Sequence, residues 1–292
     1  MNIKNDSVKF FNSKYLEIEG GQLLDGRIEI SGAKNSALVL MAASILSEGK
    51  TNLLNVPKIS DVEIMSDILI AMGINIKFKN NKLEINTESI IKPPKNLFFD
   101  LHNALRASFF CIGPVLAKFG KAEIPMPGGC SIGARPIDEH IEALKKLGVK
   151  FQFDNNYVIA EVTNPNKKLI GSLVNFQCKS VGATETLIMA ASLAQGKTIL
   201  HNAAQEPEII DLANMLNKMG AKVKGAGTDC ITIEGVENLK GCEYEVMPDR
   251  IEAGTFLIAA AITRSIITLS PIEPKHLREV INKLEMSGCN FE

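Results

Sequence analysis

The chain has 292 residues, of which 46% are hydrophobic, 22% are charged and only 5% are aromatic, and its formal net charge is −1. This balance argues against a nucleic-acid partner, because phosphate binding needs an excess of basic residues and base stacking needs aromatic side chains. The length is too great for one ordinary core, so it predicts two domains or a domain of repeated units with an aliphatic interior.

The N-terminus and the cysteines both favour a cytoplasmic protein. Residues 1–14 lack the apolar stretch of a signal peptide, and no run in the chain reaches the roughly 18 apolar residues of a membrane span. The six cysteines form no Cys-x-x-Cys pair, which favours free thiols over a zinc site or a disulfide framework. The four histidines are too dispersed to propose a metal site. We therefore expect neither membrane insertion nor a metal.

Short motifs recur along the chain at a nearly constant offset of about 147 residues. The recurring pairs are Met41-Ala42-Ala43-Ser44 with Met189-Ala190-Ala191-Ser192, Gly49-Lys50-Thr51 with Gly196-Lys197-Thr198, and Met72-Gly73 with Met219-Gly220. Two further copies end at Gly148 and Gly288. The sequence therefore predicts four repeats of about 70–75 residues each.

Each repeat is predicted to run helix, strand, helix and strand pair. In the first repeat we expect helices at 37–46 and 61–72 and strands at 51–56, 74–78 and 82–86. Ser60 and Glu63 have the spacing of a capping box, and Gly73 stands where a left-handed C-cap is needed. In the third repeat, Pro207 opens the second helix and Gly220 ends it.

The two Gly-Lys-Thr triplets invite comparison with a phosphate-binding loop. That motif needs a further glycine upstream, but the two positions hold Ser44 and Ala191. We therefore interpret the triplets as turns between a helix and a strand, with Lys50 and Lys197 in solvent.

The second repeat carries a Pro/Gly-rich loop at residues 125–136 that the other repeats lack. Arg135 precedes Pro136 at the start of a predicted helix, where unpaired N–H groups favour a phosphate. A stabilised thiolate at Cys130 would serve as an acid, a base or a nucleophile. The alternative is a surface turn with an incidental thiol.

Basic and polar residues open several other predicted helices. Lys34 and Asn35 begin the first helix of repeat one, and Arg106 and Arg250 occupy equivalent starts in repeats two and four. A single cation at a helix start is usually solvated, but together these starts outline a convergent anion site.

Taken together, these motifs resemble the enolpyruvyl transferases over essentially the whole chain. The resemblance is carried by Gly32-Ala33-Lys34-Asn35, Leu105-Arg106-Ala107-Ser108, residues 127–136, Ser180-Val181-Gly182-Ala183-Thr184, Glu206-Pro207-Glu208-Ile209 and Pro248-Asp249-Arg250-Ile251-Glu252. The loop around Cys130 is the specific feature, because the branch of the family that makes 5-enolpyruvylshikimate 3-phosphate lacks it. The resemblance implies transfer of the enolpyruvyl group from phosphoenolpyruvate to the 3′-hydroxyl of UDP-N-acetylglucosamine, the first committed step of peptidoglycan and thus cell-wall synthesis.

The resemblance also implies an α/β fold in which six helix–strand units form a two-domain inside-out α/β barrel, with the active site in the cleft. By that comparison residues 34–247 form a complete three-unit domain, whereas residues 1–33 with 248–292 form one of three units of the second. The remaining third of the family's six-unit chain would hold the family's aspartate base and residues that clamp phosphoenolpyruvate. We accordingly expect exposed apolar surface on the fourth repeat and self-association through the incomplete domain.

For the site, the resemblance implies cations at Lys34, Arg106 and Arg135, an orienting amide at Asn35, and an acid at Cys130 that also bonds covalently to phosphoenolpyruvate. The nucleotide-sugar would lie along Arg135, Pro136, Ile137, Asp138 and His140, with Ser180, Val181 and Gly182 holding its diphosphate. Cys178 replaces a basic residue common in the family, which puts one diphosphate contact in question. No cofactor is implied. The alternative function is a truncated, non-catalytic nucleotide-sugar-binding fragment.

Overall fold

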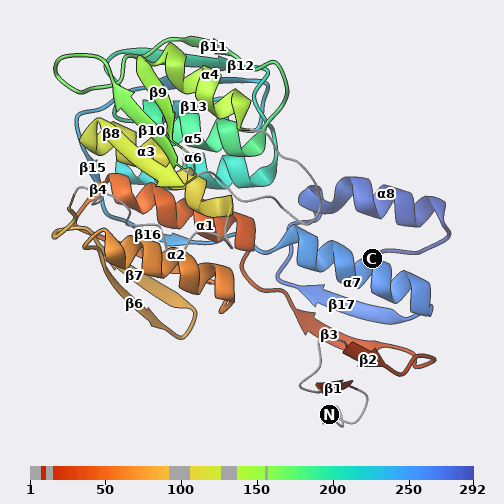
Figure 1. Cartoon of the computed structure of the whole chain (residues 1–292). Coiled ribbons are helices and arrows are strands. Elements are labelled where there is room, and N and C mark those ends of the chain that lie inside the picture. The colour runs from red at the N-terminus through yellow and green to blue at the C-terminus, as the bar shows by residue number, and fades with distance from the viewer. Residues whose placement is uncertain (1–7, 11–15, 92–105, 126–136, 155–156) are drawn as a thin grey trace. The chain divides into compact units, whose positions relative to one another are not determined.

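The computed structural model describes the chain except for residues 1–7, 11–15, 92–105, 126–136 and 155–156 (Figure 1). The chain divides into two compact units. The larger unit is Ser31–Met247, and the smaller unit combines Met1–Ile30 with Pro248–Glu292. In the described part of the chain, every helix is too short or too polar to cross a membrane.

The described residues of the larger unit form three pairs of α-helices, one pair for each of the first three predicted repeats. The pairs are α1 (Lys34–Ala43) with α2 (Ser60–Ala71), α3 (Ile112–Phe119) with α4 (Asp138–Lys146), and α5 (Val181–Ala191) with α6 (Pro207–Met219). Short 3₁₀ helices cover Ser44–Leu46 after α1 and Arg106–Cys111, labelled η2, before α3. The repeated helix–strand architecture of an α/β protein is therefore confirmed.

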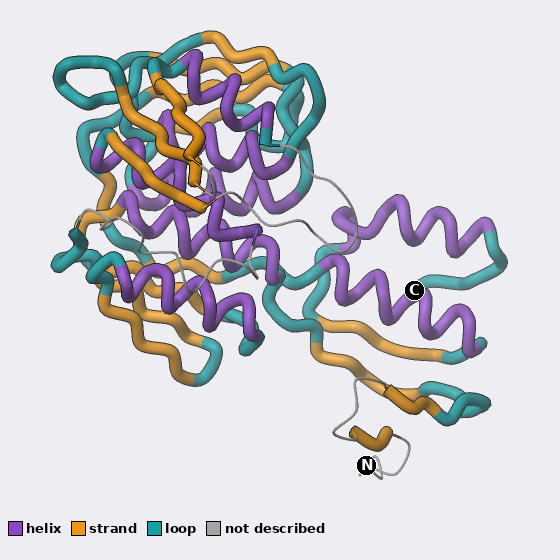
Figure 2. Tube along the Cα trace, viewed as in Figure 1, coloured by secondary structure: helices purple, strands orange, loops and turns teal. Residues whose placement is uncertain are grey.

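The first helix of each pair lies in the interior of the larger unit, and the strands lie at its periphery (Figure 2). In α1 the eight residues from Ser36 to Ala43 are all buried, and in α5 the nine residues from Ala183 to Ala191 are buried. Both helices are buried on every side, although α5 includes the polar residues Thr184, Glu185 and Thr186. They therefore need cover in every direction, whereas a surface helix has one apolar stripe. Sheets and second helices supply that cover.

In the described part of the larger unit, three sheets of three or four strands surround these helices, besides the two-stranded pair of β15 (Leu239–Lys240) and β4 (Ser47–Glu48). The first has the order β16 (Glu243–Glu245), β5 (Lys50–Leu54), β7 (Lys82–Asn86) and β6 (Asn75–Lys79); the second β8 (Lys121–Pro125), β10 (Tyr157–Val162) and β9 (Val149–Asp154); the third β11 (Leu173–Asn175), β12 (Lys197–His201), β14 (Cys230–Glu234) and β13 (Lys222–Lys224). Within a repeat the strands that follow its helices pair antiparallel.

Strands that follow the third repeat pair with the first repeat. β15 (Leu239–Lys240) is parallel to β4 (Ser47–Glu48), and β16 is parallel to β5, with Tyr244 opposite Leu53. The three repeats therefore close into a ring, because the chain leaving the third one is hydrogen-bonded to the first.

The smaller unit holds the fourth helix pair, α7 (Arg250–Thr263) and α8 (Arg278–Met286), with the 3₁₀ helix η3 (Pro274–Leu277) between them. β17 (Ile266–Ser270) is parallel to β3 (Asp25–Glu29), and β1 (Val8–Phe10) pairs with β2 (Leu16–Ile18). Ile30, Ala253 and Leu277 form its small core.

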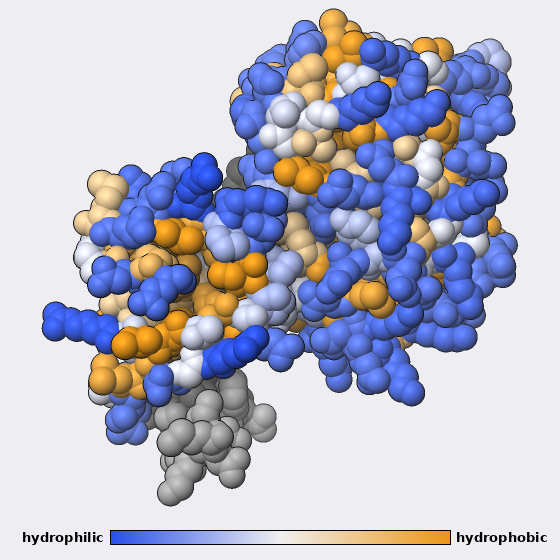
Figure 3. All heavy atoms as spheres, turned by 180° about the vertical axis from the view of Figure 1, so that it is seen from behind, coloured by the Kyte–Doolittle hydropathy of each residue, from blue (hydrophilic) through white to orange (hydrophobic). Residues whose placement is uncertain are grey.

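The smaller unit exposes several large apolar side chains, and Figure 3 shows apolar side chains gathered over its surface. Helix α7 has the composition of a buried helix, yet its residues Ile258 and Ile262 are 54% and 81% exposed. Ile266 of β17 and Met286 of α8 are exposed as well, at 84% and 81%. This apolar face of α7, β17 and α8 contrasts with the buried α1 and α5.

The glycines that end the second helices have the backbone conformation predicted for them. Gly73, Gly148, Gly220 and Gly288 have φ values of 79°, 88°, 108° and 92°, which is the left-handed region that glycine adopts without steric cost. Turns also occur at both Gly-Lys-Thr triplets, since Gly49 and Gly196 have positive φ and β5 and β12 begin at the following lysines. The turn at Gly196 leads from a helix to a strand as predicted, whereas Gly49 lies between the two strands β4 (Ser47–Glu48) and β5.

The predicted capping box at Ser60 and Glu63 is wrong. Helix α2 begins at Ser60 itself, so Ile59 is the N-cap and no side chain caps the helix there. Asp61 and Glu63 instead place two carboxylates in the first turn, where they interact favourably with the helix dipole.

Two acidic residues, Glu185 of α5 and Glu208 of α6, are buried within the larger unit at 2% and 3% exposure. Burial raises the pKa of Glu185 well above its usual value, and the negative charges of Glu208 and Glu206 raise it further. Keeping the Glu185 carboxylate ionised in this position therefore opposes folding.

Glu185→Gln should make the free energy of unfolding less sensitive to pH. The folded-state pKa of Glu185 lies above its ordinary value of 4.5, so its contribution to stability is complete below that pH and is lost as the pH rises through the folded-state pKa. The stability of the variant relative to the wild type should therefore increase between about pH 5 and about pH 8 in urea denaturation. A difference that stays constant over this range would contradict the raised pKa.

Candidate functional site

The predicted site residues fall into two described groups and one undescribed segment. Cys130, Arg135 and Pro136 lie outside the described residues, and Arg106 opens η2 with its side chain also outside them. The first described group is Lys34 with Asn35. The second comprises Ile137, Asp138 and His140 of α4 with Ser180, Val181 and Gly182 of α5.

The first group lies at the start of α1. Lys34 Nζ is 3.6 Å from Asp61 Oδ1, so the starts of α1 and α2 are adjacent. The side chains of Lys34 and Asp61 are 47% and 29% exposed, and an ion pair in such contact with water is worth about 1 kcal/mol or less. An anionic ligand can therefore replace Asp61 as the partner of Lys34 at small cost, with the exposed Asn35 beside it.

The second group forms where α4 packs against the first turn of α5. Ser180 is the N-cap of α5, and its hydroxyl accepts a hydrogen bond from Ala183 N at 3.3 Å. A Cβ atom placed on Gly182 would lie 3.0 Å from His140 Nε2. Glycine thus allows the imidazole to approach the helix backbone closely, and the imidazole lies beside N–H groups that have no partner within the helix.

His140 is held in place by its neighbours. It is 6% exposed, and its ring packs edge-on against Phe109, with 5.3 Å between ring centroids and an interplanar angle of 80°. Ile137, the N-cap residue of α4, is 7% exposed, whereas Asp138 is exposed at the first helical position. One face of the first turn of α4 is therefore anchored while the other meets solvent.

Glu139, which is not among the site residues predicted from the sequence, organises the loop before α5. Its two carboxylate oxygens accept hydrogen bonds from Gln177 N at 3.2 Å and from Cys178 N at 3.0 Å. Its position between Asp138 and His140 was the available signal, but its partners lie in a different repeat. Glu139 orients the backbone leading into Ser180 and leaves the Cys178 side chain exposed.

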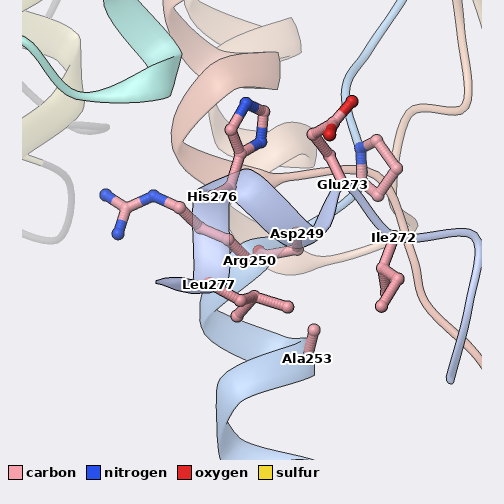
Figure 4. Close-up of a pocket in the computed structure, with 8 residues that line it drawn as sticks. Asp249, Arg250, Ala253, Ile272, Glu273, His276 and Leu277 are labelled. Atoms are coloured by element: carbon pink, nitrogen blue, oxygen red, sulfur yellow. The ribbon is translucent and has the colours of Figure 1, made fainter. Parts of the chain in front are cut away.

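A third helix start, that of α7, lies in the smaller unit. Asp249 caps α7 by accepting from Ile251 N at 2.8 Å and Glu252 N at 3.1 Å. Figure 4 shows the recess beside this cap. Its lining comprises Pro248, Asp249, Arg250, Ala253, Ile272, Glu273, His276 and Leu277. The lining thus combines charged residues with apolar ones at this helix start.

Chemically, the starts of α1 and α5 suit anions. A helix N-terminus presents backbone N–H groups and a partial positive charge, and phosphate groups bind readily there. At α1 the donor set includes a lysine and an amide, and at α5 it includes an imidazole. The arrangement is therefore suited to a ligand that carries phosphate or carboxylate groups.

The sequence matches the family described as EPSP synthase (3-phosphoshikimate 1-carboxyvinyltransferase) over residues 18–292. A relative from Prochlorococcus marinus strain SARG, named UDP-N-acetylglucosamine 1-carboxyvinyltransferase 2, is 59% identical, and the match covers 95% of this chain and 65% of the relative. The enzyme named UDP-N-acetylglucosamine 1-carboxyvinyltransferase in Prochlorococcus marinus strain MIT 9301 is 55% identical, with 98% and 62% covered. The chain thus spans less than two thirds of the length of these relatives.

Solved structures share the fold. The enolpyruvyl transferase NikO from Streptomyces tendae superposes with a TM-score of 0.76 at 18% identity, covering 93% of this chain and 64% of that one. EPSP synthase from Acinetobacter baumannii gives a TM-score of 0.71 at 21% identity, covering 92% and 60%. These values show the enolpyruvyl transferase fold.

Gly182→Ala should disturb the contact between α4 and α5. The new methyl group would meet His140 Nε2 at 3.0 Å and Phe110 Cε1 at 3.3 Å, and the packing of His140 against Phe109 leaves the ring little room to move. The matched control is Gly254→Ala in α7, where the nearest atom lies at 3.7 Å. Alanine is favoured in the helix interior at 254, and the clash at 182 opposes any such gain there. The free energy of unfolding should therefore be about 1–3 kcal/mol lower for Gly182→Ala than for the control. Equal values in denaturant titrations would contradict this packing.

Proposed function

The chain belongs to the EPSP synthase family of enolpyruvyl transferases, and we propose that it transfers the enolpyruvyl group of phosphoenolpyruvate to the 3′-hydroxyl of UDP-N-acetylglucosamine with release of phosphate. The main support is the 59% identity, over 95% of this chain, to a relative named for that activity. The proposal places the chain in the first committed step of peptidoglycan synthesis, in the cytoplasm.

In the proposed reaction, the sugar hydroxyl adds to C2 of phosphoenolpyruvate while C3 gains a proton. The tetrahedral intermediate then loses a proton from C3 and expels phosphate, which restores the double bond. The protein has to supply cations for the phosphate and carboxylate, a proton donor at C3 and a base for the hydroxyl. We assign Lys34, Arg106 and Arg135 as the cations and Cys130 as the donor, which also forms the covalent adduct with phosphoenolpyruvate.

The α1 start suits the proposed role of Lys34 and Asn35. The half-exposed pair with Asp61 gives Lys34 a partner that a dianionic substrate can replace. Asn35 is exposed at the next position, from which its amide can donate to one substrate oxygen and accept from another group. We assign it to orienting the substrate or the intermediate.

The contact between α4 and α5 suits the nucleotide-sugar. Ser180, Val181 and Gly182 form a helix start that can receive the diphosphate, and His140 lies against the same turn. Pro136, Ile137 and Asp138 precede His140 along the chain, which places the proposed sugar-nucleotide contacts on one continuous segment. The Glu139 carboxylate holds the backbone just before Ser180 in place, by accepting hydrogen bonds from Gln177 N and Cys178 N.

A second function in the same family is transfer to shikimate 3-phosphate, which the name of the matching family favours. The relatives at 59% and 55% identity carry the other name, and the loop around Cys130 resembles that of the UDP-N-acetylglucosamine branch. A third possibility is a nucleotide-sugar-binding protein without turnover, which needs only the α4 and α5 contacts.

The proposed activity predicts phosphate release that depends on both substrates. The purified chain should release phosphate from phosphoenolpyruvate when UDP-N-acetylglucosamine is present and not when shikimate 3-phosphate replaces it. Cys130→Ala should lower the rate by about 10²-fold or more, since it removes the proton donor, whereas Cys230→Ala in β14 should leave it unchanged. Binding of UDP-N-acetylglucosamine without phosphate release would favour the binding protein, and release with shikimate 3-phosphate would favour the second transferase.

We also propose that copies of the chain associate through the apolar face of α7, β17 and α8. Ile262 and Ile266 are more than four-fifths exposed, and exposed apolar surface promotes association. Sedimentation velocity should show a species that grows with concentration. Ile262→Glu should reduce it, whereas Ile170→Glu, at a 49% exposed position in the larger unit, should not. A monomer at all concentrations would contradict the proposal.

A further inference from the structure

The chain passes between its two units at residues 30–31 and again at 247–248. On the larger unit's side, the two crossing segments, residues 31–33 and 246–247, lie side by side, because Ala33 N donates to Met247 O at 2.7 Å. The first crossing segment leads directly into Lys34. The position of Lys34, the proposed catalytic lysine, therefore depends on the contacts that hold the two crossing segments in place.

The buried side chain of Asp211 in α6 connects helix α1, which follows the first crossing segment, to the second crossing segment. Its Oδ2 accepts hydrogen bonds from Ser36 Oγ, two residues after Lys34, and from Met247 N at 3.4 Å. Its Oδ1 accepts from the hydroxyl of Tyr244 at 2.7 Å. A carboxylate that is 8% exposed thus joins the first turn of α1 to β16 and the second crossing segment.

Asn55 supports the same junction from the other side. Its Nδ2 donates to Val246 O at 3.0 Å. A Cβ atom on Gly32 would lie 1.7 Å from the Asn55 carbonyl oxygen, so the first crossing segment runs directly against that backbone and only glycine fits. Asn55 itself has a φ of 57°, which turns the chain after β5 toward the two segments.

An acceptor-only group at position 211 suits the junction, because Met247 N can only donate and the Ser36 and Tyr244 hydroxyls both donate here. Three donors converge on Asp211, and an ionised carboxylate has enough lone pairs for all of them, whereas an asparagine would turn its NH₂ group toward at least one donor. Burial raises the pKa of Asp211, and the bonds from Ser36, Tyr244 and Met247 oppose that rise. An apolar group at this position would remove all three hydrogen bonds at once.

We infer that Asp211 is a positioning residue for the proposed reaction: through Ser36 it fixes Lys34 and Asn35, and through Met247 and Tyr244 it fixes the second crossing segment. This inference rests on the proposed function for the roles of Lys34 and Asn35. Asp211 acts by holding the first turn of α1 and the second crossing segment in a single arrangement, and we assign it no contact with substrate.

The first test is hydrogen exchange in Asp211→Asn, which reports on the junction without turnover. Amides in peptides that cover residues 31–37 and 244–249 should exchange about tenfold faster or more, because their local opening becomes easier, while the rest of the larger unit keeps its protection. Glu185→Gln, the change of another buried carboxyl to an amide, is the matched control and should leave both peptides unchanged.

The second test separates positioning from binding in the kinetics. Asp211→Asn should lower kcat by about 10-fold to 10²-fold, since small displacements of catalytic groups have effects of that size. The dissociation constant for UDP-N-acetylglucosamine should change by about twofold or less, because its proposed contacts lie on α4 and α5. Ser36→Ala keeps Asp211 and Tyr244 in place and should reproduce the loss of kcat, whereas Tyr244→Phe should reduce it less.

The outcomes are distinct. Unchanged exchange at both peptides in Asp211→Asn and Ser36→Ala would overturn the anchor, and faster exchange with an unchanged kcat would overturn the positioning role. Faster exchange throughout the chain would mark Asp211 as a general stabilising residue and also overturn it. If the wild-type chain shows no turnover, the proposed function fails, and the exchange data alone decide whether Asp211 holds the junction.

Discussion

Burial of two helices on every side is the constraint on which the larger unit depends. Helices α1 and α5 leave no polar face for solvent, so each must be covered by other helices and by sheets. The close contact of α3 with α5 shows how tightly they pack, because a Cβ atom on Gly113 would lie 2.5 Å from Thr186 O. The chain has no tryptophan, so small and aliphatic side chains fill the interior at the density typical of proteins. The pairing of β15 and β16 with the first repeat closes the ring of repeats around α1 and α5.

The same packing explains why the candidate site is assembled from helix starts. A helix that is buried along its length can present polar groups only at its ends, and Lys34 and Ser180 stand at such ends. In each case a buried contact just inside the helix fixes the exposed groups. Ser36 meets Asp211 behind Lys34, and Gly182 meets His140 behind Ser180. Anion-binding groups are thereby placed at the surface, at the ends of helices that are otherwise buried.

Much of the fold follows from local patterns, whereas part of the site does not. The repeat period and the glycines at 73, 148, 220 and 288 are strong local signals, because a left-handed C-cap depends mainly on the residue itself. The prediction of a capping box failed because α2 starts one residue earlier than expected, which puts Ser60 inside the helix instead of at its N-cap. Glu139 and Asp211 could not be predicted as organising residues, because each binds partners from other repeats. The loop around Cys130 was predicted from its composition, and it lies outside the described residues.

The pairing of β3 with β17 has a consequence for the order of folding. Ile28 lies opposite Leu269 across this ladder, so the whole of Ser31–Met247 is inserted between two strands of the smaller unit. During synthesis the inserted unit is complete before β17 leaves the ribosome, and domains generally fold as units in the order of their synthesis. Strand β3 therefore stays unpaired until β17 is synthesised, more than 200 residues later. The intervening chain is already folded when the two strands pair. The entropic cost of so distant a contact is reduced accordingly, because the intervening chain is no longer a flexible coil.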